Sequence, residues 1–174
     1  MSDLVRTSFL LAQEREGLRL AEESDILSLE PLASPPHERY VLRFAAQSVL
    51  ADRDGPREGS GVFVVGVWFP GDYLQRVAIP QVLTWLGPRE LFHPNVNGPF
   101  LCLGPFRPGT PLVEICYRVY SVISYQNYGL ANPLNPTAAA WARRHLDRFP
   151  VDPRPLKRRL AAFKTRVFEK GGAA

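Results

Sequence analysis

The hydrophobic periodicity of the chain changes near residue 111, and this change limits the folds that the chain can adopt. Four earlier segments show the alternation, or the β-branched and aromatic runs, of strands, with Pro- or Gly-rich turns between most of them: 25–32, 39–50, 62–69 and 77–86. After residue 111, apolar residues recur at helical spacing instead. Because the connections between the strands are short, the sequence predicts an antiparallel meander and then helices, which is an α+β domain.

Helices are expected on both sides of these strands. Residues 3–16 predict an N-terminal helix with a partial apolar stripe through Leu4 and Leu11. Residues 112–125 predict a crossover helix. Its apolar face consists of Leu112, Ile115, Cys116, Val119, Val122 and Ile123.

Two further helices are expected toward the C-terminus. Asn135 is a suitable N-cap and Pro136 suits a first helical position, so a helix is expected to start there. Residues 153–170 predict a basic amphipathic helix. The expected architecture is an N-terminal helix, a four-stranded antiparallel meander, an active-site loop, a crossover helix and two C-terminal helices.

The connections and the domain limits complete this expectation. Residues 51–61 are rich in turn-forming residues and predict a loop. Pro80 lies inside the fourth predicted strand, which therefore should be an edge strand or contain a bulge. We expect one domain over 1–174 with its core over about 3–148.

The composition indicates in which compartment the protein is expected and which cofactors and partners are not expected. No apolar run approaches the ~20 residues that span a bilayer, and no signal peptide is recognisable, so we expect a cytoplasmic protein that binds no membrane. Cys102 and Cys116 should stay reduced in that compartment, and three scattered histidines form no ligand motif, so no metal or other cofactor is expected. The net charge of +4 is too small to predict nucleic-acid binding.

Cys102 is the candidate reactive residue. It follows the segment HPNVNGPF, whose Pro, Gly and Asn content predicts an exposed loop, whereas Cys116 lies on the apolar face of a predicted helix. Acyl transfer through a thioester needs a reachable thiolate and a fixed donor for the oxyanion. Asn95, held in a turn by Pro94, carries an amide that could be such a donor.

The order of these motifs resembles the ubiquitin-conjugating enzymes. The matching features are FHPNV, then the Cys102-Leu103 pair, then an amphipathic helix and NPLNPTAA, with FPGDY earlier in the chain. The likeness covers about residues 3–148. The Arg-rich composition, with only three lysines, is similar to that of divergent bacterial members of ubiquitin-like conjugation systems, some linked to antiviral defence.

The resemblance implies a transferase. Cys102 would accept the C-terminus of a ubiquitin-like protein from an activating enzyme as a thioester, and an amine of a target protein, usually a lysine, would then attack it. Asn95 would stabilise the oxyanion or the loop, and His93 would hold the turn and would not act as a base. The helix over 3–16 would contact the activating enzyme.

The sequence departs from the family pattern at several positions. The spacing from Asn95 to Cys102 is one residue shorter than usual. Asn132 stands where the family often has an acidic residue that orients the incoming lysine. Asn132 could accept a hydrogen bond there but brings no charge, and Asn127 and Tyr128 nearby could contribute instead. Gln75 replaces an expected aromatic residue in a turn that RING ligases grip, and FRPGTP over 106–111 lacks an expected tryptophan.

Three alternatives stay open. The chain could be an inactive scaffold that binds ubiquitin-like partners through the same fold. It could be a cysteine hydrolase, although the proline turn aims His93 poorly at the sulfur. It could bind nucleic acid through the basic residues of 157–170, in which case binding should fall steeply with salt.

Overall fold

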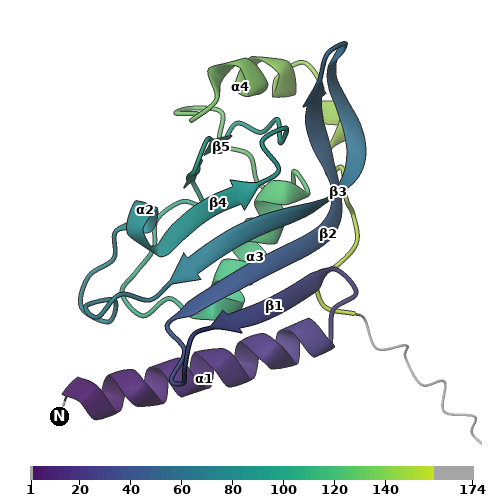
Figure 1. The fold of residues 1–174 in the computed structure, drawn as a ribbon. Helices are drawn as coiled ribbons and strands as arrows, with labels where there is room; N and C mark the ends of the chain where they lie inside the picture. Colours follow the sequence, from purple (N-terminus) through teal and green to yellow (C-terminus); the bar gives the residue numbers. More distant parts are fainter. Residues whose placement is uncertain (1, 159–174) are drawn as a thin grey trace, which may run out of the picture.

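The computed structural model describes residues 2–158, and these form a helix, an antiparallel sheet and a set of shorter helices (Figure 1). The elements in chain order are α1 Ser2–Glu22, β1 Leu27–Leu32, β2 Arg39–Asp52, β3 Gly55–Trp68, α2 Ile79–Val82, β4 Leu83–Gly87, β5 Val96–Asn97, β6 Phe100–Leu101, α3 Leu112–Ile123, α4 Pro136–Ala142 and a 3₁₀ turn Leu146–Arg148. The predicted α+β class is confirmed. No helix in the described part of the chain is both long and apolar enough to cross a membrane.

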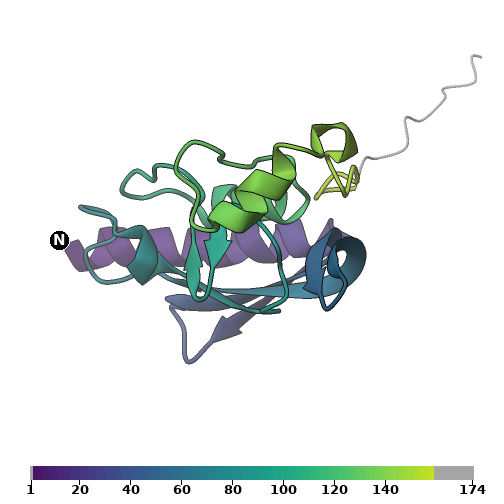
Figure 2. The same ribbon diagram turned by 90° about the horizontal axis from the view of Figure 1, so that it is seen from above.

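The sheet is the predicted antiparallel meander, in the order β1-β2-β3-β4. Helix α3 covers one face of the sheet, and α1 runs along its β1 side, as the two perpendicular views show (Figures 1 and 2). The main core lies between α1, α3 and the inner face of the sheet. All six residues predicted for the buried face of α3, from Leu112 to Ile123, are fully buried there.

Helix α1 is longer than predicted and buries a different face. Leu4 and Leu11 are exposed, and the buried positions are Leu10 and Gln13 instead. The side chain of Gln13 accepts a hydrogen bond from the backbone N–H of Leu112 at 2.8 Å, so α1 satisfies a free donor at the first turn of α3. At Gly17 a Cβ would lie 2.9 Å from the side chains of Leu29 and Leu112, so the close approach of the helices requires glycine there.

The predicted loop over 51–61 is wrong, because these residues extend the β2–β3 hairpin. Both strands are 14 residues long, and Asp52 pairs with Gly55 at the turn. The hairpin also binds the chain that follows β4. The N–H of Ala51 donates to the carbonyl of Glu90 at 2.7 Å, and the N–H of Phe92 donates to the carbonyl of Val49 at 2.9 Å. The end of β2 therefore pairs with β3 on one side and with the chain after β4 on the other, and this pairing outweighs the turn propensity of the segment.

The predicted strand over 77–86 is correct only in its second half. Pro80 lies in the first turn of α2, where its missing N–H costs no hydrogen bond, and the strand begins at Leu83. The start of α4 is confirmed, because the Asn135 side chain accepts from the N–H of Ala138 at 3.0 Å.

The C-terminal helix predicted over 153–170 is not helical at 153–158, and its remaining residues lie outside the described part of the chain. The segment before residue 159 packs on the domain instead. Leu156 is buried in the main core, and the Asp152 carboxylate accepts from the N–H of Gln47 on β2 at 2.9 Å and pairs with Arg154 at 2.6 Å. Although burial opposes ionisation, these donors lower the pKa of Asp152 to about 2.

Candidate functional site

Cys102 directly follows the short hairpin β5–β6. Side chains alternate along the second strand and just beyond it: Leu101 and Leu103 are only 5% and 3% exposed, whereas Phe100 is 55% exposed and Cys102 is partly exposed. The alternation of an extended chain therefore turns the Cys102 side chain to the solvent side. Cys116 is the contrasting thiol, because it is fully buried in the main core and burial raises its pKa to about 12.

Asn95 connects the Cys102 segment to the chain after α3. Its Nδ2 donates to the carbonyl of Cys102 at 2.9 Å, and its Oδ1 accepts from the N–H of Gly129 at 2.6 Å. The backbone adds a third bond, from the N–H of Cys102 to the carbonyl of Asn95 at 2.8 Å. The turn at Asn95, the Cys102 segment seven residues later and the distant segment of Gly129 thus meet at one amide, which holds the reactive segment in place.

His93 is completely buried beneath this turn. Its Nδ1 accepts a hydrogen bond from the N–H of Asn95 at 3.0 Å, which leaves the proton of the neutral ring on Nε2. Burial lowers the pKa of His93 to about 3, so the ring stays neutral. With its basic nitrogen already bonded and its ring shielded from solvent, His93 is suited to hold the turn and unsuited to take a proton from Cys102.

Aromatic residues support the turn from below. We call the cluster of Val49, Tyr125, Trp141, Ala142 and Val151, with the partly buried Phe92, Tyr128, Leu130 and Phe149 around it, the site core. The ring of Tyr125 meets the His93 ring edge-on, with centroids 4.3 Å apart, and its hydroxyl donates to the carbonyl of Phe92. Tyr125 also stacks on Phe149 at 4.5 Å. Burial raises the pKa of Tyr125, which stays a neutral donor.

The residues expected to orient a lysine lie on the segment between α3 and α4. Asn132 and Asn127 are exposed, and Tyr128 is half-buried against Phe149. No hydrogen bond joins the Asn132 side chain to another described residue. The segment itself is held near the hairpin, because Asn97 donates to the carbonyl of Leu134 at 3.2 Å.

Sequence reasoning missed Tyr125 and Gly129, two residues after α3 that contact the turn. A Cβ at Gly129 would lie in van der Waals contact with Asn95, 3.4 Å from its side-chain nitrogen and oxygen. Both contacts join residues more than 30 positions apart, which no local pattern reports.

The other histidines lie in different surroundings. The Nδ1 of His37 lies 2.8 Å from the Glu14 carboxylate of α1, and His145 stacks on Trp141 with ring centroids 4.2 Å apart. In residues 2–158, no group of three His, Cys, Asp or Glu side chains could hold a metal ion. The site therefore consists of one accessible thiol, an amide that fixes its segment and an aromatic support.

Comparisons with known proteins add no relative to this description. No family model matches the chain, and no similar sequence is found among curated proteins.

Proposed function

We propose that the protein is a ubiquitin-conjugating-type acyl carrier. The Cys102 thiolate attacks the thioester carbonyl that joins a ubiquitin-like protein to its activating enzyme, and the thiolate of that enzyme leaves. A neutral amine of a target protein, usually a lysine, then attacks the new thioester, forms an amide and releases the Cys102 thiolate. The observation that carries the proposal is the accessible Cys102 thiol on a segment fixed by Asn95, after an HPN turn.

Asn95 serves this reaction chiefly by holding the loop. One of its two Nδ2 hydrogens is bonded to the Cys102 carbonyl, so only the other could reach an oxyanion. The bond from Gly129 further fixes the amide plane. Such a preorganised segment keeps the sulfur in one position while a large acyl group arrives and leaves.

Helix α1 is the surface proposed to contact the activating enzyme. Leu4, Val5 and Leu11 expose 74%, 63% and 49% of their surface on this helix. We expect Leu11→Glu to slow loading by about tenfold, since an interface leucine contributes roughly 1–2 kcal/mol. The rate of Cys102 alkylation should not change, and a change in that rate would show that the variant disturbs the site instead.

The alternatives differ in what they require of Cys102 and His93. A cysteine hydrolase needs an imidazole within hydrogen-bond reach of the sulfur, and the His93 nitrogen that could accept a proton is occupied by the N–H of Asn95. An inactive scaffold does not need an accessible thiol. The resemblance alone supports a bacterial conjugation system or a role in antiviral defence.

The direct test is a thioester assay. The protein is mixed with a ubiquitin-like protein, its activating enzyme and ATP, and it is then run on a non-reducing gel with and without thiol. Pairs of such proteins encoded beside this chain in its genome are the candidates to use. We expect a band shifted by the mass of the partner, which disappears with thiol and is absent in Cys102→Ala.

Two variants sharpen the assay. Cys102→Ser should give a band that resists thiol, because an oxyester replaces the thioester, and Cys116→Ala should load normally. Binding of the partner without a band would favour the scaffold, and Cys102-dependent cleavage of small ester substrates would favour the hydrolase.

A further inference from the structure

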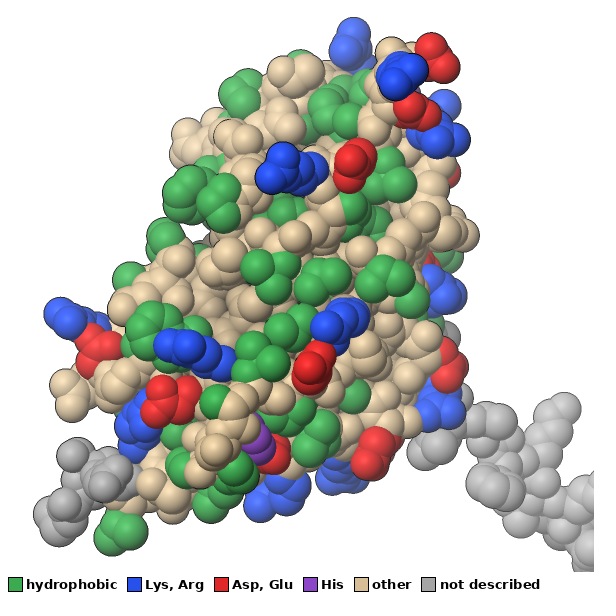
Figure 3. Space-filling view, in the orientation of Figure 1, with side chains coloured by type: hydrophobic (Ala, Val, Ile, Leu, Met, Phe, Trp, Pro, Cys, Tyr) green, Lys and Arg blue, Asp and Glu red, His purple; other side chains and the backbone are tan. Residues whose placement is uncertain are grey.

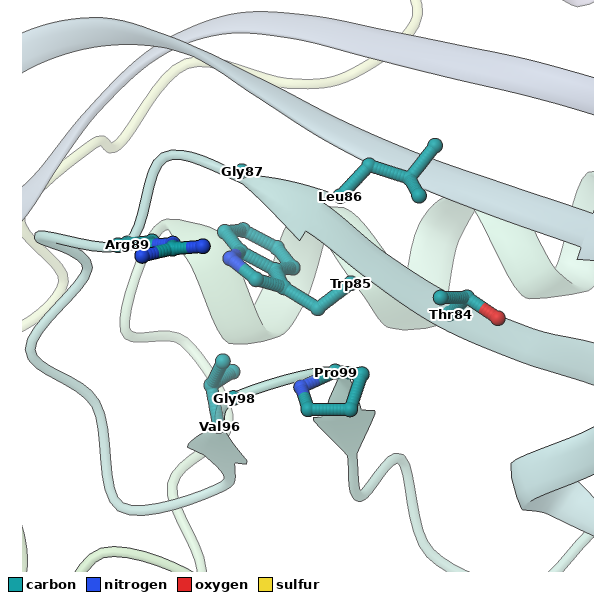
Figure 4. A pocket seen from close by; sticks show the side chains of 8 residues that line it. All are labelled: Thr84, Trp85, Leu86, Gly87, Arg89, Val96, Gly98 and Pro99. Atoms are coloured by element: carbon teal, nitrogen blue, oxygen red, sulfur yellow. The ribbon is translucent and has the colours of Figure 1, made fainter.

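A pocket of about 560 Å³ lies between β4 and the hairpin that leads to Cys102 (Figure 4). Its walls come from β4, the segment after it and the hairpin: Thr84, Trp85, Leu86, Gly87, Arg89, Val96, Gly98 and Pro99. Pockets that bind small molecules have volumes of roughly 300–1,000 Å³. The size is therefore sufficient for one large side chain and the backbone beside it.

The pocket is mainly apolar. The indole of Trp85 lies between the strand and the hairpin, and Pro99 lies across from it (Figure 4). The only polar atom of this indole, Nε1, already donates to the carbonyl of Pro88 at 2.9 Å. Because only 6% of Trp85 is exposed, its ring forms the floor of the pocket. The apolar side chains that the pocket offers are those of Leu86 and Pro99, which are exposed and suit an aliphatic or aromatic side chain.

Arg89 is the only charged residue among those that line the pocket. Its side chain is exposed and lies at the end of the pocket nearest the indole nitrogen of Trp85 (Figure 4). It forms no ion pair or hydrogen bond with another residue of the described chain. A guanidinium in this state can bind a carboxylate through two parallel hydrogen bonds.

The pocket is coupled to the position of Cys102. The N–H of Trp85 donates to the carbonyl of Pro99 at 2.9 Å, so a hydrogen bond joins the wall of the pocket to the hairpin. Pro99 precedes Cys102 by three positions, a span of at most ~10 Å of extended chain. Thr84 and Leu86, which line the pocket, are exposed. The face of the molecule in Figure 3 carries hydrophobic side chains between charged ones.

We propose that this pocket binds an acidic–apolar segment of the target protein. An apolar side chain packs on the exposed Leu86 and Pro99 above the Trp85 ring, and a carboxylate next to it pairs with Arg89. A segment bound in this way would bring an acceptor about three residues further along to the Cys102 sulfur. This second part, the docking of the acceptor, rests on the proposed function, whereas the binding of the segment does not.

Binding is tested on the free protein by the NMR signal of the Trp85 indole N–H, assigned with Trp85→Phe. The probes are blocked tetrapeptides with the sequences GLDG, GLNG and GADG. We expect a saturable shift with GLDG, and about fivefold weaker binding of the other two. Arg89→Gln should reduce the affinity for GLDG to that for GLNG, and Arg53→Gln, at the distant β2–β3 turn, should not change it. The absence of a saturable Trp85 shift, or an equal loss for GLDG and GLNG in Arg89→Gln, would overturn the proposal.

Acceptor docking is tested by single-turnover discharge of the preloaded thioester to the peptides LDGGK and LNGGK. LDGGK should react about fivefold faster at subsaturating concentration, and Arg89→Gln should remove the difference. Equal rates despite intact binding would show that the pocket does not position the acceptor. A failure to load at all would overturn the proposed function, and the indole titration would still report on the pocket.

Discussion

The main core and the site core of this protein are built in different ways. The main core is formed largely by regular elements, in which apolar residues of α1, α3 and the sheet pack together. The site core has one strand residue, Val49, and a short helix, and the rest of it comes from irregular segments with large aromatic side chains. Its geometry depends on single hydrogen bonds, such as those of Asn95 and of the Tyr125 hydroxyl. The segment of Cys102 is anchored in the main core through Leu101 and Leu103, whereas the hydrogen bonds of the site core can be removed one at a time.

The largest expected contrast is between the two cysteines, because Cys116 lies inside the main core and Cys102 is partly exposed beside the turn. Iodoacetamide at pH 8 should alkylate Cys102 at least about 100-fold faster than Cys116, because the Cys116 thiol is fully buried and its pKa of about 12 leaves almost no thiolate. Mass spectrometry of digested samples measures both rates. In urea the two rates should converge, and similar rates in the native protein would contradict the burial of Cys116.

The pH dependence of the free energy of unfolding should reveal that the fold keeps His93 neutral. The folded protein keeps His93 neutral down to its pKa of about 3, whereas the unfolded chain binds a proton below about pH 6.5. The unfolded state thus gains protons first, and stability falls as the pH falls from 6.5 toward 3, by up to about 1.4 kcal/mol per pH unit. Urea unfolding at pH 7.5, 6 and 5 should show this slope, and His93→Gln should reduce it. An identical slope in the variant would exclude His93 as its origin.

Asn95→Ala should cost about 2 kcal/mol, because it leaves the Cys102 carbonyl and the Gly129 N–H without their partner. Hydrogen exchange of the Gly129 amide should become faster. Asn95→Asp is the matched variant for Gly129, since it keeps the acceptor for that N–H, although it replaces the donor to Cys102 by a charged oxygen and should destabilise at least as much. Asn97→Ala, at an exposed position, should cost less than about 0.5 kcal/mol.

If both Asn95 variants leave Gly129 exchange unchanged, the amide does not connect these segments in solution. In the thioester assay, an oxyanion role would appear as slower discharge in Asn95→Ala with Cys102 alkylation unchanged. A role in holding the loop would alter alkylation and discharge together.

A smaller loss of stability than in Asn95→Ala is expected from removing a single tyrosine hydroxyl, and one tyrosine from each core can be compared. Tyr125→Phe and Tyr120→Phe each remove a hydroxyl that donates to a backbone carbonyl, that of Phe92 or that of Arg154, and each should cost about 1 kcal/mol. Only Tyr125→Phe should alter the alkylation rate of Cys102, because only Tyr125 supports the turn. An equal change of that rate in both variants would show that the site responds to global stability alone.

The local sequence pattern determined much of this molecule. Alternation located three of the four strands, helical spacing identified the buried face of α3, and Asn135-Pro136 marked the start of α4, because each pattern expresses contacts or sterics within a few residues. The same reasoning distinguished the buried Cys116 from the accessible Cys102.

Only the tertiary structure decided the rest. Residues 51–61 extend the β2–β3 hairpin because they pair within it, and because the end of β2 also bonds to the chain after β4. Helix α1 buries Gln13 and Gly17 because α3 lies against them. The contacts of Asn95 with Gly129 and of Tyr125 with His93 and Phe92 likewise span more than 30 residues, so no local period encodes them. The sequence could indicate which thiol is reachable. The hydrogen bonds that hold its segment through Asn95 are complete only once the segment after α3 has packed against the turn.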